Sequence, residues 1–142
     1  MSTDLGRFLA AQEGAYGTVL YELRQGRKAS HWMWFVFPQF AGLGRSAMAQ
    51  RFALHSLDEA RAYLADPVLG GRLRDGAALL LAVRDRTAVE ILGDIDAVKL
   101  RSSMTLFHRA DPVEPASGQV LDRFFGGDAD AATDALLGDR GG

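Results

Sequence analysis

Residues 56–83 read SLDEARAYLADPVLGGRLRDGAALLLAV, and this stretch decides the fold class because it contains two helix starts in succession. Ser56 and Glu59 form a capping box, in which the serine side chain accepts a hydrogen bond from the third amide and the glutamate reaches back. Asp66 can cap the following helix, with Pro67 in its first turn. The stretch therefore predicts two consecutive helices.

Helix signals continue on both sides of this stretch. Apolar side chains recur at three- and four-residue steps from Leu5 to Leu23, which predicts one amphipathic helix that ends at Gly26. Elsewhere, capping residues and helix breakers follow one another at short intervals. These signals are a cap at Ser46 for a short helix to about Phe52, a second capping box at Thr87 and Glu90, a stop at Gly93, a cap at Asp94 or Asp96 for a helix to about Arg109, a break at Asp111–Pro112, a start at Pro115 for a helix ending at Gly126–Gly127, and a cap at Asp128 for a last helix through Leu137.

Only residues 32–37 alternate in a way that resembles a strand, and a single short strand has no partner elsewhere in the chain. The sequence therefore predicts an all-α fold, with one domain of about six to eight helices and an irregular aromatic segment at 30–45. We place the core of this domain at about 4–137 and expect a ragged end at 138–142.

The composition is that of an ordinary globular domain of 142 residues, with 48% hydrophobic and 24% charged side chains. The net charge of −2 argues against a protein that grips duplex DNA. The longest apolar run, 77–83, is too short to span a bilayer, and no signal segment is recognised, so we expect a cytoplasmic protein with no membrane partner. The absence of cysteine and the wide spacing of His31, His55 and His108 predict no metal site, and we expect no cofactor.

Two motifs stand apart from the helix signals, and the first is GRKASHWMWFVFPQ at 26–39, which holds both tryptophans of the chain. Aromatic side chains bury more area than any others, so Phe35 and Phe37 are expected in the core. For His31, Trp32 and Gln39 a second interpretation has equal weight. Aromatic groups beside cationic and amide groups also suit a flat anionic ligand.

The second motif is DAVKLRSSMTLFH at 96–108. On a helix, Lys99, Ser102, Ser103 and Leu106 share one face, which is either a ligand wall or a polar patch satisfied within the core. The chain has 14 arginines but only two lysines, Lys28 and Lys99, and each lies in one of the motifs. This distribution indicates two places that need a compact ammonium group, and it predicts that the motifs meet in one pocket.

The strings GRKxSHWMWFVFPQxxGLGxS, EAxAYLxDPVLGxRL and DxxKLRSSMTLF resemble the domain of unknown function 1810 family, small bacterial proteins sometimes mislabelled calpastatin. The resemblance covers the chain from about Asp4 to Leu137 and implies a compact fold of several helices, while the family has no established activity. A weaker similarity, in size, helical class and style of site only, links the chain to the helical N-glycosidases of the NADAR group. Those enzymes handle ADP-ribose-like or ribosylaminopyrimidine substrates, and the likeness is one of fold class.

The site residues fit an enzyme that acts on a phosphorylated, nucleotide-like small molecule, with hydrolysis of an N-glycosidic bond as the favoured reaction. Phosphate would be held by lysines and arginines, the base would stack on an indole, and an amide would read its edge. The residues expected in these ligand-binding roles are Lys28, Trp32, Trp34, Gln39, Lys99, Arg101, Ser102 and Ser103.

Hydrolysis also needs a carboxylate to stabilise positive charge on the sugar and to activate water, and Glu22 and Asp96 are the candidates. His31 is the expected proton donor. Each acid has an ordinary alternative, with Asp96 as a helix cap and Glu22 as an ion-pair partner of Arg24 or Lys28.

A second function class uses the same pocket without chemistry, as a binding module for an anionic metabolite or a protein partner. The two classes differ in geometry. If neither candidate carboxylate points into the cavity lined by His31 and Lys99, binding without chemistry becomes the better interpretation.

Overall fold

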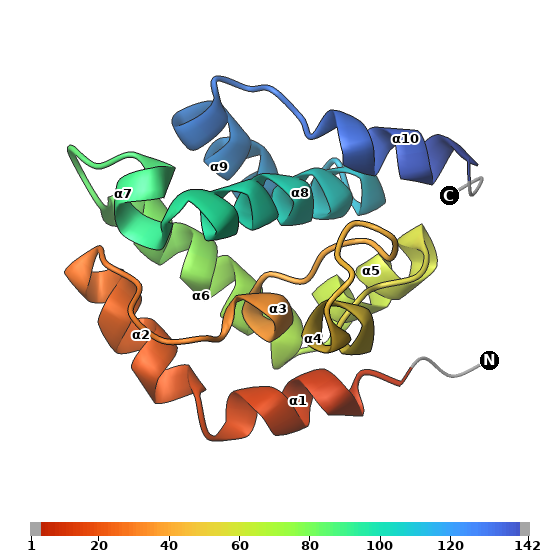
Figure 1. Ribbon diagram of the computed structural model, residues 1–142, viewed down its shortest axis with the longest axis horizontal. Coiled ribbons are helices and arrows are strands. Elements are labelled where there is room, and N and C mark those ends of the chain that lie inside the picture. Colours follow the sequence, from red (N-terminus) through yellow and green to blue (C-terminus); the bar gives the residue numbers. More distant parts are fainter. Residues whose placement is uncertain (1–3, 140–142) are drawn as a thin grey trace.

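Helices make up the regular secondary structure of the computed structural model, which describes residues 4–139 (Figure 1). The predicted all-α class is confirmed. Within the described residues the helices are α1 (Gly6–Glu13), α2 (Tyr16–Gln25), α3 (Met33–Val36), α4 (Ala47–Arg51), α5 (Leu57–Ala65), α6 (Leu69–Ala82), α7 (Ala88–Leu92), α8 (Asp94–Ala110), α9 (Pro115–Phe125) and α10 (Ala131–Asp139).

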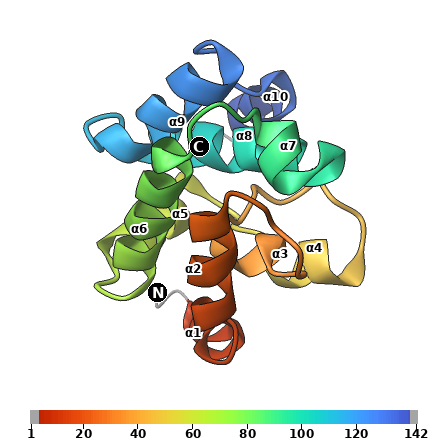
Figure 2. The same ribbon diagram turned by 90° about the vertical axis from the view of Figure 1, so that its left-hand side faces the viewer.

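The central helix is α8, which crosses the middle of the molecule in Figure 1 and packs against α5, α7, α9 and α10. Its Leu100, Met104, Leu106 and Phe107 side chains are completely buried. The next longest helix, α6, packs against α2, α5 and α9. Figure 2 shows α2 upright between α6 and α3, with its end below the loop from α6 to α7.

The single helix expected from Leu5 to Leu23 is divided into α1 and α2 at Gly14. Glycine is a poor helix former, and here the backbone amide of Ala15 donates to the Gln12 carbonyl in a tight turn. The apolar stripe continues across the break because both helices bury one face. The sequence pattern alone therefore gave no sign of the change in direction.

The aromatic segment is irregular, as predicted, apart from the four residues of α3. The strand alternative for 32–37 is wrong, because Met33–Val36 is helical. Phe35 is 7% exposed and Phe37 is completely buried, which confirms their predicted place in the core. The ring of Phe35 lies 5.4 Å from that of Phe52, and Phe37 lies 6.4 Å from Trp32.

Several predicted helix ends are confirmed by hydrogen bonds. The side chains of Ser46 and Thr87 accept from the amides three residues later, and Glu90 completes the capping box at Thr87. Asp66 accepts from the first amides of the turn that leads into α6, and Pro115 opens α9.

Three caps differ from the prediction. Ser56 caps α5, but Glu59 reaches the amide of His55 (2.8 Å) instead of that of Ser56. No side chain caps α8, because Asp94 and Asp96 both lie inside its first turn and Gly93 occupies the cap position. The last helix is capped by a different aspartate from the expected one.

The aspartate that caps α10 is Asp130, whose carboxylate accepts from the amide of Thr133 at 3.0 Å, and not Asp128. Of the end that we expected to be ragged, Gly138 and Asp139 still belong to α10. Residues 140–142 lie outside the described part of the chain.

Candidate functional site

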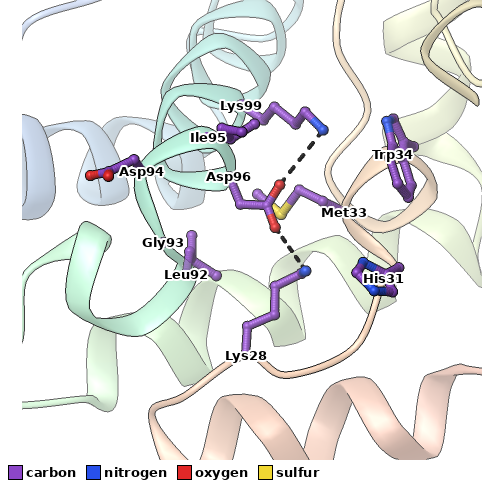
Figure 3. Close-up of a pocket in the computed structure, with 10 residues that line it drawn as sticks. All are labelled: Lys28, His31, Met33, Trp34, Leu92, Gly93, Asp94, Ile95, Asp96 and Lys99. Atoms are coloured by element: carbon purple, nitrogen blue, oxygen red, sulfur yellow. Dashed lines mark ion pairs between the residues drawn. The ribbon is translucent and has the colours of Figure 1, made fainter. Parts of the chain in front are cut away.

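A cleft of about 450 Å³ forms where the two sequence motifs meet (Figure 3). Lys28, His31 and Trp34 line it from the first motif, and Asp96 and Lys99 line it from the second. The prediction that these segments form one pocket is confirmed. The end of α7 and the first turn of α8 complete its wall.

The loop that carries the first motif is fixed at its start. Gly26 ends α2 in the left-handed conformation (φ 69°), which favours glycine. Two residues later, the backbone amide of Lys28 donates to the carbonyl oxygen of Ile91 in α7 at 2.7 Å. This hydrogen bond brings Lys28 beside the beginning of α8.

Glu22 lies beneath the same loop and determines its shape. Its carboxylate accepts hydrogen bonds from the backbone amides of Ala29 (2.9 Å) and Ser30 (3.0 Å), from the Ser30 hydroxyl (2.6 Å) and from the indole N–H of Trp32 (2.9 Å). Burial acts to raise the pKa of Glu22, but the hydrogen bonds from Ser30, Ala29 and Trp32 outweigh it and lower the pKa to about 2. Glu22 is therefore a preorganised anchor for the loop.

These contacts decide between the interpretations of Glu22. The alternative in which it pairs with Arg24 or Lys28 is wrong, because the donors that reach its carboxylate are those of the loop. Glu22 is also not among the residues that line the cleft. Its catalytic role stays a prediction, one that the position beneath the loop does not favour.

Asp96 is the candidate carboxylate that lies in the cleft. Its Oδ2 atom is 2.7 Å from Lys28 Nζ, and its Oδ1 atom is 3.6 Å from Lys99 Nζ. Figure 3 shows the carboxylate between the two ammonium groups. The alternative that Asp96 caps a helix is wrong, since α8 begins two residues earlier and its side chain is used in these ion pairs.

The two lysines are held to different degrees. The side chain of Lys28 is 7% exposed, and its ammonium group contacts Asp96, the Ser30 carbonyl and, at 5.1 Å from the ring centre, Trp32. The side chain of Lys99 is 19% exposed, and its ammonium group has only the longer ion pair and the Trp34 ring at 4.5 Å. Lys28 thus holds the Asp96 carboxylate in position, whereas the ammonium group of Lys99 is freer to bind a ligand.

The remaining walls combine a flat ring, a histidine and a helix N-terminus. His31 is exposed and Trp34 is half-buried, and in Figure 3 both face the two ammonium groups. Gly93 and the first residues of α8 line the opposite side, where no side chain caps the helix. The partial positive charge of the α8 N-terminus therefore adds to the charge of the lysines.

Two residues of the first motif lie away from the cleft. Trp32 is 2% exposed, and its indole N–H is taken by Glu22. Gln39 accepts a backbone hydrogen bond from Leu54 (3.0 Å) and does not line the cleft. Trp32 fits the interpretation in which the aromatic segment builds the core, whereas Gln39 is half-buried. Trp34 is the tryptophan that a ligand in this cleft would meet.

Three residues of the second motif also lie away from the cleft. The Arg101 guanidinium donates to the carbonyls of Asp128 and Ala129. The Ser102 hydroxyl lies 3.1 Å from both the Val98 carbonyl oxygen and an Asp130 carboxylate oxygen, so its one hydrogen is shared between them and links α8 to the cap of α10. Ser103 is completely buried, and its hydroxyl has no hydrogen-bond partner within the described residues. For Ser102, the interpretation as a polar group satisfied within the fold is thus confirmed.

Sequence reasoning missed half of the residues that line the cleft, most of them at the α7–α8 junction: Met33, Leu92, Gly93, Asp94 and Ile95. The junction was not expected to bind a ligand, because the sequence predicted an aspartate cap there and a capped helix start offers no free amide groups. Within residues 4–139, no group of three or more acidic, histidine or cysteine side chains is placed to hold a metal ion. No described helix is long and apolar enough to cross a membrane.

Comparisons with known proteins agree with the fold and identify the family. The crystal structure of the conserved hypothetical protein Rv1873 from Mycobacterium tuberculosis superposes with a TM-score of 0.93 and 48% sequence identity, over 95% of this chain and 96% of that one. No curated protein matches the sequence. The sequence model of the family described as "Protein of unknown function (DUF1810)" matches residues 2–137. The chain therefore belongs to the DUF1810 family.

Proposed function

We propose that the cleft binds a small phosphorylated molecule of the nucleotide or ADP-ribose type and hydrolyses its N-glycosidic bond. The observation that carries this proposal is the convergence of both lysines of the chain on the single carboxylate of Asp96. Two ammonium groups and one carboxylate leave one surplus positive charge in a partly buried cleft, and a bound anion would neutralise it. Asp94 also lines the cleft, but its carboxylate points away from this cluster in Figure 3.

The phosphate of the ligand meets Lys99 and the uncapped first turn of α8. Lys99 is held by one long ion pair and by the Trp34 ring, and when its ammonium group turns towards a phosphate oxygen it leaves that ring face to the base. The helix N-terminus supplies backbone amides of the kind that bind phosphate in many proteins. The base of the ligand stacks on the half-buried Trp34 ring.

In the proposed reaction, the bond between the sugar C1′ carbon and the base nitrogen breaks, and its electron pair goes to the nitrogen. His31 gives a proton to the departing base. Asp96 stabilises the positive charge that develops at C1′ and takes a proton from the attacking water, whose oxygen forms the new bond to C1′. A proton returned through solvent from Asp96 to His31 restores both groups.

The alternative function is binding without chemistry, and one observation favours it. Both carboxylate oxygens of Asp96 face a lysine, so the group is less free to accept a proton than an unpaired carboxylate would be. An incoming phosphate that draws Lys99 away would release Oδ1. Turnover therefore depends on whether the ligand competes for that lysine.

A thermal-shift screen against nucleotides, NAD, ADP-ribose and sugar phosphates tests the binding step. A ligand at one hundred times its Kd adds about 2.7 kcal/mol to the free energy of unfolding, which raises Tm by several degrees. We expect the shift to disappear in Lys99→Ala and to persist in Arg45→Ala, which removes an exposed charge elsewhere. A panel in which no compound stabilises the wild type, and none is turned over, would show that the proposal is wrong.

Chromatographic detection of the released base then separates the two functions. We expect turnover by the wild type and none by Asp96→Asn, with the binding shift retained in the variant. Binding without base release by the wild type would instead establish the non-catalytic module.

A further inference from the structure

We propose that a second cleft, lined by three arginines, binds the diphosphate or triphosphate group of a small ligand. The cleft has a volume of about 410 Å³ and lies between the end of α2, the end of α6 and the loop from α6 to α7. Arg24, Arg84 and Arg86 line it, together with apolar side chains such as Leu79 and Val83. Among the described residues that line it, none is acidic.

No polar contact within the described residues accounts for the three arginines. Within the part of the chain that the structure describes, none of their guanidinium groups forms an ion pair or a hydrogen bond, and all three residues are exposed. Three positive charges around one hollow give it a positive potential that attracts an anion. Guanidinium groups bind phosphate oxygens with paired N–H donors.

An arginine at the end of a helix often caps the last carbonyl groups, but here other groups already do so. Arg123 of α9 donates to the carbonyls of Leu81 and Val83 at the end of α6. At the end of α2, the amides of Gly26 and Arg27 donate to the carbonyls of Leu23 and Glu22. Capping of the helix ends therefore does not explain the three arginines that line the cleft.

The backbone of the loop supports the same conclusion. Asp85 is the non-glycine residue of the described chain with a left-handed backbone, at φ 64°. Its two neighbours, Arg84 and Arg86, both line the cleft, whereas Asp85 does not. The left-handed residue thus stands between two arginines that line the cleft and is not itself part of the lining.

A short polyphosphate fits this cleft better than a nucleic acid does. The volume of the cleft suits a small ligand. The chain as a whole carries a net charge of −2, which would repel a long polyanion. The site is also distinct from the Lys99 cleft, with which it shares no lining residue. The inference goes beyond the proposed function and does not depend on it.

Calorimetric titration with inorganic triphosphate tests the proposal on the wild-type protein and on Arg84→Ala, Arg86→Ala and the double variant. Each lost arginine should weaken binding about tenfold, because charge-assisted hydrogen bonds to phosphate contribute about that much in affinity. Arg45→Ala, the matched control, removes an exposed arginine outside the cleft and should bind as the wild type does.

Three results would overturn the inference. The first is an affinity for triphosphate that is the same in the double variant as in the wild type, including no measurable binding by either. The second is loss of triphosphate binding in Lys99→Ala with no loss in the arginine variants, which would place the anion in the other cleft. The third is tight binding of single-stranded RNA by a wild-type protein that ignores triphosphate, which would replace the small ligand by a nucleic acid. The arginines are exposed, so their variants are expected to fold, and thermal unfolding verifies this.

Discussion

Replacing Glu22 by glutamine removes the negative charge that holds the first motif in place while it keeps the size of the side chain. The residue is 6% exposed, and its carboxylate receives four hydrogen bonds from the loop. These bonds lower its pKa from the ordinary 4.5 to about 2. A change of that size corresponds to about 3 kcal/mol of folding free energy as an upper bound. Because the glutamine amide oxygen can still accept some of these hydrogen bonds, we expect a loss of about 2 kcal/mol at pH 7.

The pH dependence follows from the sign of the pKa change. A carboxylate whose pKa is lower in the folded state stabilises the fold fully above its unfolded pKa of 4.5, and this contribution is lost as the pH falls from about 4.5 towards 2. The difference in unfolding free energy between the wild type and Glu22→Gln should therefore be largest at pH 6–7 and shrink through this window.

Urea unfolding at several pH values measures this difference. Glu13→Gln is the matched control, because Glu13 is exposed on α1, and its free energy of unfolding should match that of the wild type at every pH. A destabilisation of Glu22→Gln that stays constant between pH 7 and pH 3, or one that is near zero at pH 7, would refute the role assigned to the carboxylate.

Three further predictions concern stability. A Cβ atom at Gly70 would lie 2.1 Å from a backbone carbonyl oxygen of α5, whereas nothing lies within 4 Å of one at Gly71, so Gly70→Ala should cost more than about 2 kcal/mol in urea unfolding and Gly71→Ala should cost nothing. Asp130→Ala removes the cap of α10 and its hydrogen bond to α8, which should cost about 1–2 kcal/mol and speed hydrogen exchange in α10 alone; unchanged exchange would contradict this. Lys28→Met should destabilise the protein by about 1–2 kcal/mol and Lys99→Met by less than about 0.5 kcal/mol, because Lys28 has the shorter ion pair and an additional hydrogen bond. Equal effects of the two substitutions would contradict this reasoning.

Helix ends could be predicted from the sequence wherever the cap is made by neighbours in the chain. Ser46 and Thr87 bind amides three residues away, so the local pattern contains both partners. The division at Gly14 was missed because the same apolar stripe serves one long helix or two short ones. Only the packing of both helices against the core distinguishes these arrangements.

The site could be predicted in part. The scarcity of lysine pointed to Lys28 and Lys99, and both line the cleft. The local rule for helix caps, in contrast, predicted a cap at Asp94 or Asp96 that the structure does not form. The partner that decides the position of the Asp96 carboxylate, Lys28, comes from a loop far away in sequence. The hydrogen bonds of Glu22 were missed for a related reason, since its donors converge only once the loop has folded over α2.

The central claim is that a small anionic ligand occupies the cleft between Lys99 and Trp34. The most direct measurement follows the indole N–H resonances of the two tryptophans in a nitrogen–hydrogen correlation spectrum while ADP-ribose is added. We expect the Trp34 indole and the Gly93 amide to shift with ligand concentration and the Trp32 indole, buried against Glu22, to stay in place. Shifts confined to other parts of the molecule, or none at all with ADP-ribose, nucleotides and sugar phosphates, would contradict the claim.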